Sequence, residues 1–89
     1  MRIYKQQLKE QNYQRVMLPE GSQIISVHDQ LGVTCIWFIC NPDNKLVERP
    51  IHIYMTGQLV SDNISVLKFI GTTLSDDNIV LHVFEGDLP

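Results

Sequence analysis

Residues 23–40, with the sequence QIISVHDQLGVTCIWFIC, decide the fold. Two extended runs, residues 23–29 and 33–40, flank the four residues DQLG at positions 29–32. In these four residues, Asp suits the first position of a type I turn, and Gly supplies a left-handed bulge residue after it. The stretch therefore predicts a β-hairpin.

The second arm of this hairpin, VTCIWFIC at residues 33–40, is apolar on both faces apart from one threonine. A strand of this kind is typical of the middle of a sheet whose two faces are both covered. We therefore expect residues 33–40 to form a central strand, with Trp37 in the core.

Outward from the hairpin, alternation of polar and apolar residues dominates, and clusters of Gly, Pro, Asn, Asp and Ser separate the alternating segments. No stretch carries a clean helical stripe. Further extended segments are expected at residues 2–9, 12–18, 46–56, 65–73 and 79–85. The pattern predicts an all-β fold, either a small antiparallel β-sandwich or a partly closed barrel of about six to seven strands.

Two of these segments carry positional signals. Residues 2–9 are rich in Lys and Gln, which favours an exposed edge strand. Pro50 interrupts residues 46–56 and has no backbone N–H to donate, so we expect that strand to lie at an edge or to be bulged.

The chain has 89 residues, of which 44% are hydrophobic and 19% charged, which predicts a single globular β domain over residues 1–89. Seven basic and ten acidic residues give a net charge of −3, which argues against a general nucleic-acid binder. No apolar stretch approaches the roughly 20 residues of a membrane-spanning helix, so no membrane partner is expected.

The two cysteines, Cys35 and Cys40, lie in one apolar run at an odd separation, which points them to opposite faces of a strand. We expect two free, buried thiols in a reducing compartment, and hence a protein of the cytoplasm. Thiols in apolar surroundings have a raised pKa and are poor nucleophiles.

The histidines do not suggest a metal site. His28, His52 and His82 lie far apart in the sequence without paired metal-ligand spacing, and no phosphate-cradling glycine loop is present. His82 shares a strand face with Val80 and Phe84 and is expected to be a half-buried or core histidine. Neither a metal, a cofactor nor a catalytic residue is predicted, and an enzyme is the least favoured class because no nucleophile, base and orienting group can be assembled.

A polar and aromatic row is the best candidate for a binding site. His52, Tyr54 and Thr56 alternate and therefore project from one face of their strand, where Tyr can stack on a base and His and Thr can form hydrogen bonds. With Arg49 and Lys68 as cations for phosphate, these residues make a candidate site for a small nucleotide-like ligand. The alternative is the ordinary solvated face of an antiparallel strand.

An ordered series of short motifs resembles a known family. It consists of MLPEG and IISV at residues 17–21 and 24–27, GVTCIW at 32–37, NP at 41–42, TG at 56–57, FIGT at 69–72 and VLHVFE at 80–85. They resemble, in order, the MPxGAKILSV motif (the first two stretches), NGVPCLW, an Asp-Pro pair, the GTG of a GTGHPI segment, YIGT and LVFHLFE in short phage and prophage proteins of unknown function. The resemblance implies a phage-encoded protein of the host cytoplasm and supplies no functional residues.

The residues and the family resemblance together are compatible with several functions. The favoured one is a small phage binding protein that counters host defence by sequestering a nucleotide-type immune signal. Because so small a domain has little interior to hollow out, we expect the pocket at the interface of a homo-oligomer. The alternatives are a protein–protein inhibitor of a host enzyme, which would present a sheet edge or an apolar patch, and a phage accessory protein with another role.

Overall fold

The computed structural model describes residues 1–89, and its regular elements are almost entirely β-strands. The strands are β1 (Arg2–Gln7), β2 (Tyr13–Pro19), β3 (Gln23–Gln30), β4 (Val33–Cys40), β5 (Leu46–Met55), β6 (Lys68–Leu74) and β7 (Val80–Glu85). The only helical element is one 3₁₀ turn, η1 (Ile64–Val66), so no helix is long enough to cross a membrane. The all-β prediction is confirmed.

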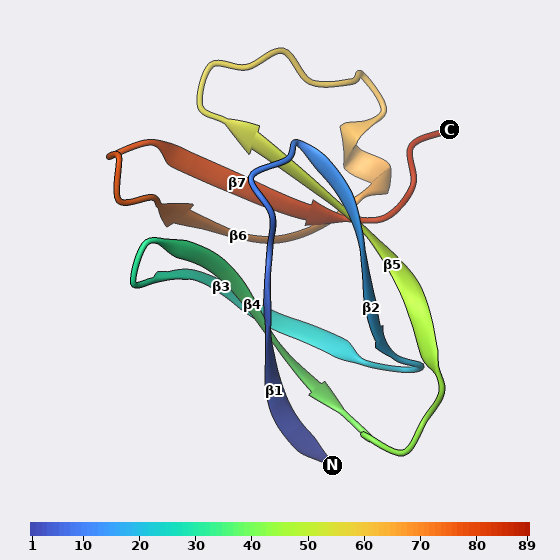
Figure 1. The fold of residues 1–89 in the computed structure, drawn as a ribbon. Helices are drawn as coiled ribbons and strands as arrows, with labels where there is room; N and C mark the ends of the chain where they lie inside the picture. The colour runs from blue at the N-terminus through green and yellow to red at the C-terminus, as the bar shows by residue number, and fades with distance from the viewer.

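The strands form two antiparallel sheets that pack face to face as a sandwich (Figure 1). One sheet has three strands in the order β1-β4-β3, and the other has four in the order β2-β5-β7-β6. The sheets are not joined into a barrel. At one side β3 lies against β6, where the backbone N–H of Asp29 donates to the Thr73 hydroxyl at 3.0 Å.

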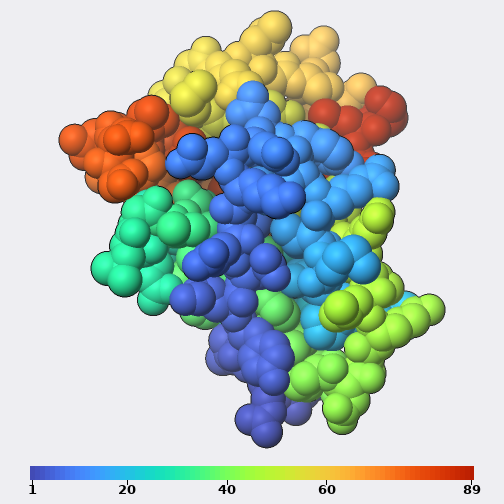
Figure 2. Space-filling view, viewed as in Figure 1, coloured from blue at the N-terminus to red at the C-terminus, as the bar shows by residue number.

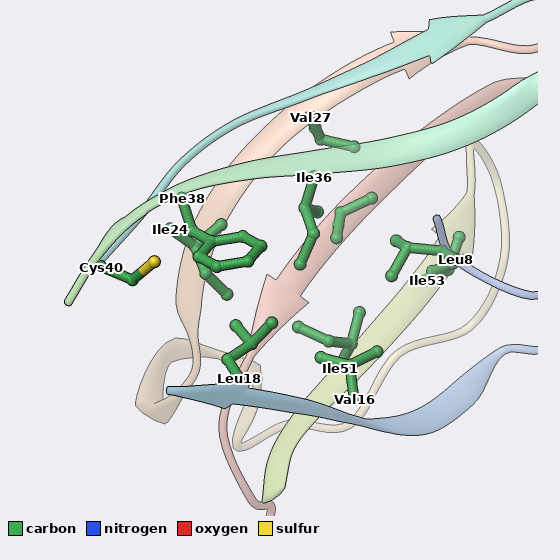
Figure 3. Packing of buried hydrophobic residues seen from close by; sticks show 11 residues of the cluster. Leu8, Val16, Leu18, Ile24, Val27, Ile36, Phe38, Cys40, Ile51 and Ile53 are labelled. Carbon is green, nitrogen blue, oxygen red and sulfur yellow. The ribbon is translucent and has the colours of Figure 1, made fainter. Parts of the chain in front are cut away.

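The core lies between the sheets, where every second side chain points inward (Figure 3). Ile36 of the three-stranded sheet and Leu18, Ile51 and Val83 of the four-stranded sheet have no exposed surface. Burying each of these side chains contributes about 1.5–3 kcal/mol relative to leaving it in water. The two layers therefore depend on each other, because neither sheet has another cover for this face.

The predicted hairpin is confirmed as β3 and β4, but its turn is of another type. Leu31 and Gly32 both have positive φ, at 53° and 85°, which is the pattern of a two-residue type I′ turn. The bulge lies instead within β3, between Ile24 and Ser26. The backbone twist of a type I′ turn matches the right-handed twist of the paired strands, whereas a type I turn would force the two strands apart.

Strand β4 is central, as predicted, but the second sheet covers only one of its faces, and the placement of Trp37 in the core is wrong. Ile36 and Phe38 point into the sandwich, whereas Trp37 and Ile39 are half-buried on the outward face. Trp37 lies between Lys5 of β1 and Ser26 of β3. The two sheets use nearly all of a chain of this length, so no third layer covers this face.

Three further expectations about the chain can be compared with the structure. Strand β1 lies at an edge, as expected, and Cys35 and Cys40 are free and buried, as expected.

The expectation that Pro50 puts its strand at an edge or a bulge is wrong, because β5 runs between β2 and β7. Strand β7 ends at Glu85, however, and the Pro50 carbonyl accepts a hydrogen bond from Gly86 just beyond it. The proline nitrogen faces this same side, where the ladder has already ended.

The expected strand over residues 65–73 begins later than predicted. The η1 turn occupies Ile64–Val66, and β6 starts at Lys68. The connection from β5 to β6 is therefore a long loop over residues 56–67, which extends beyond the sheet and returns through η1 (Figure 1, yellow to orange).

The type I′ turn predicts that Leu31→Asn stabilises the protein. Leu31 is 99% exposed, so its side chain contributes no packing, while its positive φ costs about 1 kcal/mol that asparagine largely avoids. We expect the melting temperature to rise by about 4–8 °C in calorimetry.

Leu59→Asn is the matched control, because Leu59 is 93% exposed and does not have a positive φ. It is expected to leave the melting temperature unchanged. Equal effects of the two substitutions would contradict the strain at Leu31.

Candidate functional site

Aromatic rings gather on the outer face of the four-stranded sheet. The registers of β5, β7 and β6 place Tyr54 opposite His82 and Phe84 opposite Phe69. The ring centroids of Tyr54 and Phe84 are 5.9 Å apart in an edge-to-face arrangement, and those of Phe69 and Phe84 are 5.2 Å apart. This geometry is typical of favourable aromatic pairs and forms a continuous apolar floor across three strands.

The loop over residues 56–67 makes a wall beside this floor. Gln58 turns the chain at the end of β5, donating its N–H to the Met55 carbonyl and accepting the Met55 N–H on its side-chain oxygen, both at 3.0 Å. Leu67 is buried at the other end of the loop and packs closely against Gly86. The loop is thus tied to the sandwich at both ends.

Floor and wall border an open pocket of about 480 Å³, which we call the face pocket. Its volume lies within the range of small-molecule sites. The face pocket is lined by Tyr54, Met55, Thr56, Gly57, Gln58, Val60, Ile64, Ser65, Leu67, Phe69, His82 and Phe84.

His82 is held at both ring nitrogens by threonines. The Thr56 hydroxyl lies 2.8 Å from Nε2 and the Thr72 hydroxyl lies 2.9 Å from Nδ1. A hydroxyl can donate or accept, so this pair satisfies either neutral tautomer of the imidazole. The ring is therefore fixed in orientation, and its nitrogens are already engaged.

None of the residues lining the face pocket is Lys, Arg, Asp or Glu. Its polar groups are neutral hydroxyl and amide groups and the His82 ring. Together with the aromatic floor, such a lining suits a planar, uncharged ring system, which gains from stacking and from a few hydrogen bonds.

The structure brings only part of the predicted site together. Tyr54 and Thr56 line the face pocket. His52 is on the same outer face but is buried, and its Nε2 lies 3.0 Å from the Gly86 carbonyl. Its ring lies against Tyr13 on one side, with centroids 4.8 Å apart, and stacks with Tyr54 on the other at 6.2 Å. His52 therefore fastens the segment after β7 and supports Tyr54 from behind.

Arg49 and Lys68, the predicted phosphate ligands, belong to the other side of this sheet. Arg49 forms an ion pair with Glu85 and also donates to the Ser22 carbonyl at 2.7 Å. Lys68 lies opposite Glu85 in the β6–β7 register, at an inward-facing position. Neither of the two cations lines the face pocket.

A third cation, Arg15, lies on the outer face but on the far strand, β2. Its guanidinium donates to the Tyr13 hydroxyl at 3.0 Å and to Glu48 at 2.9 Å. Hydrogen bonds to Tyr13 and then to Glu48 raise the pKa of Arg15 above its ordinary value. Arg15 therefore forms its hydrogen bonds within the β2–β5 strand pair and does not line the face pocket.

A second hollow, of about 390 Å³, lies at one end of the sandwich, and we call it the end pocket. The β1–β2 connection (blue), the β3–β4 hairpin (green) and the β6–β7 hairpin (orange) converge there (Figure 2). Its rim carries the carboxylates of Glu10, Asp29, Asp76 and Asp77, with Lys9 as the only cation. These carboxylates disfavour an anionic ligand, and none of the predicted site residues lies there.

Sequence reasoning missed His82, Phe69 and Phe84 as site residues. Side chains two residues apart share a strand face, so alternation groups Tyr54 with Thr56 on β5 and His82 with Phe84 on β7. What the pattern does not contain is the pairing of β7 with both β5 and β6, which brings the two rows together. No cluster of three or more His, Cys, Asp or Glu side chains is placed to hold a metal ion.

Fold and site together define a two-sheet β-sandwich with an uncharged pocket on the outer face of its larger sheet. The chain belongs to the family described as "Domain of unknown function (DUF7352)", whose model matches residues 1–89. No curated protein and no solved structure matches it. The matched residues include all of the short motifs, which lie between residues 17 and 85.

The Arg49–Glu85 pair predicts a large effect of Arg49→Met on stability. The substitution leaves the Glu85 carboxylate, whose side chain is only 11% exposed, without its main partner. Removing one partner of such a pair is expected to lower the free energy of unfolding by about 3 kcal/mol in urea denaturation.

Arg15→Met is the control, since both partners of the Arg15–Glu48 pair are more than half exposed. We expect it to leave the unfolding midpoint unchanged, because solvent screens exposed pairs. A small effect of Arg49→Met, equal to that of Arg15→Met, would show that the Glu85 pair does not stabilise the fold.

Proposed function

We propose that this protein is a binding protein that captures a small nucleotide-like ligand in the face pocket. The observation that carries the proposal is the aromatic floor of Tyr54, Phe69 and Phe84 beneath the loop over residues 56–67. Aromatic faces on a sheet stack on heterocyclic bases, and each such contact is worth about 1–3 kcal/mol. The loop borders the bound ring on one side.

The polar groups around the floor support recognition of a heterocycle. The Thr56 hydroxyl retains hydrogen-bonding capacity beyond its contact with His82. The Gln58 side-chain oxygen accepts the Met55 N–H, so its amide NH₂ group is left as a donor at the pocket. Ring nitrogens and exocyclic groups of a base offer matching partners for these groups.

Binding rather than catalysis is favoured by the state of the reactive side chains. Both ring nitrogens of His82 are bonded to threonine hydroxyls, so a substrate would have to displace a threonine to exchange a proton with the ring directly. Cys35 and Cys40 are at most 1% exposed and lie away from the face pocket. The Thr56 hydroxyl lies 2.8 Å from His82 Nε2, but the neutral Thr72 hydroxyl orients this ring and no carboxylate lines the pocket, so the acidic partner typical of a catalytic triad is missing.

The biological role we propose is sequestration of a nucleotide-type immune signal of a bacterial host by a phage-encoded protein in the host cytoplasm. It rests on the resemblance of the ordered motifs to short phage and prophage proteins, together with the ligand class that the pocket suits. One chain lines the whole face pocket, so capture does not depend on the homo-oligomer that we expected from the sequence.

A second candidate, inhibition of a host protein, is favoured by the outer face of the three-stranded sheet. Trp37 and Ile39 are half-buried there, and Ile3 and Ile25 are 62% and 42% exposed on the flanking strands. No other element covers this face. An uncovered apolar face of this kind is typical of protein interaction surfaces.

Ligand capture predicts a thermal shift. At a concentration about 100 times its dissociation constant, a bound ligand stabilises the native state by about 2.7 kcal/mol, which raises the melting temperature of a domain this size by about 10–20 °C. We expect such a shift for at least one member of a panel of nucleosides and linear and cyclic nucleotides in differential scanning fluorimetry.

His82→Ala is expected to abolish this shift, whereas His28→Ala is expected to retain it. His28 lies on β3, in the other sheet, and is paired with Cys35. A panel that leaves the melting curve unmoved would overturn ligand capture and leave the Trp37 face as the favoured functional surface.

A further inference from the structure

We propose that the face pocket recognises the uncharged base of its ligand and leaves any phosphate groups in solvent. The inference rests on the proposed function and narrows it, since it states which part of a nucleotide-like ligand is bound. It follows that a nucleoside and its phosphorylated forms bind with similar affinity.

Burying a phosphate in this pocket is costly. None of its lining residues is Lys or Arg. An anion taken from water into a site without a cationic partner loses hydration that nothing replaces. A neutral base loses far less hydration and gains the aromatic contacts of Tyr54 and Phe84.

The cations of this sheet do not line the face pocket. Arg49 is paired with Glu85, and Lys68 lies opposite Glu85 in the β6–β7 register, at an inward-facing position. Arg15 is paired with Glu48 and lies opposite Pro50, four residues before Tyr54 along β5. At about 3.3 Å per residue, that separation is about 13 Å along the strand.

The overall charge of the chain also opposes a phosphate. The net charge is −3, and Asp76 and Asp77 of the β6–β7 turn, which line the end pocket, contribute to it. This field opposes the approach of a polyanion, and more strongly at low salt. Selection for a phosphate would require the opposite arrangement.

The experiment is calorimetric titration of the full chain with the four ribonucleosides and their 5′-mono- and triphosphates. We expect at least one nucleoside to bind and its phosphates to change the dissociation constant by less than about threefold at about 150 mM salt. Raising the salt from about 50 to about 500 mM is expected to change nucleoside affinity by less than about twofold.

Variants separate the base from the phosphate contribution. Thr56→Val keeps the shape of the side chain but removes a hydroxyl from the pocket, and Tyr54→Ala removes part of the floor. Each is expected to weaken nucleoside binding by about tenfold. Lys68→Gln is the control and is expected to leave both nucleoside and nucleotide affinities unchanged. Circular dichroism of each variant establishes that the fold is intact.

Two results would contradict the inference in different ways. A nucleotide that binds more than about tenfold tighter than its nucleoside, with affinity that falls with salt or on Lys68→Gln, would overturn base-only recognition while leaving ligand capture in place. Failure of every nucleoside and nucleotide to bind would overturn the proposed function itself.

Discussion

The structure depends on the contact between the inner faces of its two sheets. Leu18, Ile36, Ile51 and Val83 are completely enclosed there, and they come from four different strands of the two sheets. A chain of 89 residues supplies enough apolar side chains for one such layer and no more. Each sheet therefore keeps an outer face that does not pack in the core. The chain partly covers the outer face of one sheet and leaves that of the other without such a cover.

On the four-stranded sheet, the long β5–β6 loop and the C-terminal segment partly cover the outer face. His52 accounts for much of this arrangement, because it bonds to the Gly86 carbonyl while its ring supports Tyr54. Leu67 packs on Gly86 from the loop side. The face pocket is the space left between this cover and the aromatic floor, so the site results directly from the way the outer face is shielded. The outer face of the three-stranded sheet has no such cover.

Much of the fold was predictable from the sequence because strand positions follow from alternation and turn residues. Tyr54 and Thr56 were grouped correctly for the same reason, since residues two apart share a strand face. Parity alone already separates Arg49 from them, because it lies at an odd distance from His52 along β5. The failure at Trp37 is of another kind. An apolar row on each face of β4 does not indicate which face the second sheet covers.

The remaining site residues were beyond the sequence pattern because they depend on which strands pair. The charge of Lys68 makes it a candidate phosphate ligand, and only its register with Glu85 shows that it lies at an inward-facing position. Phe69, His82 and Phe84 become neighbours of Tyr54 only because β7 pairs with both β5 and β6. The wall over residues 56–67 likewise required knowledge of the fold, since a loop in the sequence has no assigned side of the sheet.

The most direct test of this site is a methyl-resolved NMR titration of the protein with a nucleoside. We predict chemical-shift changes at the methyl groups of Val60, Ile64 and Leu67, which line the face pocket. Leu8 and Ile79, which line the end pocket, are expected to stay unmoved. Changes confined to Leu8 and Ile79, or to Ile3 and Ile39 on the outer face of the three-stranded sheet, would contradict binding at the face pocket.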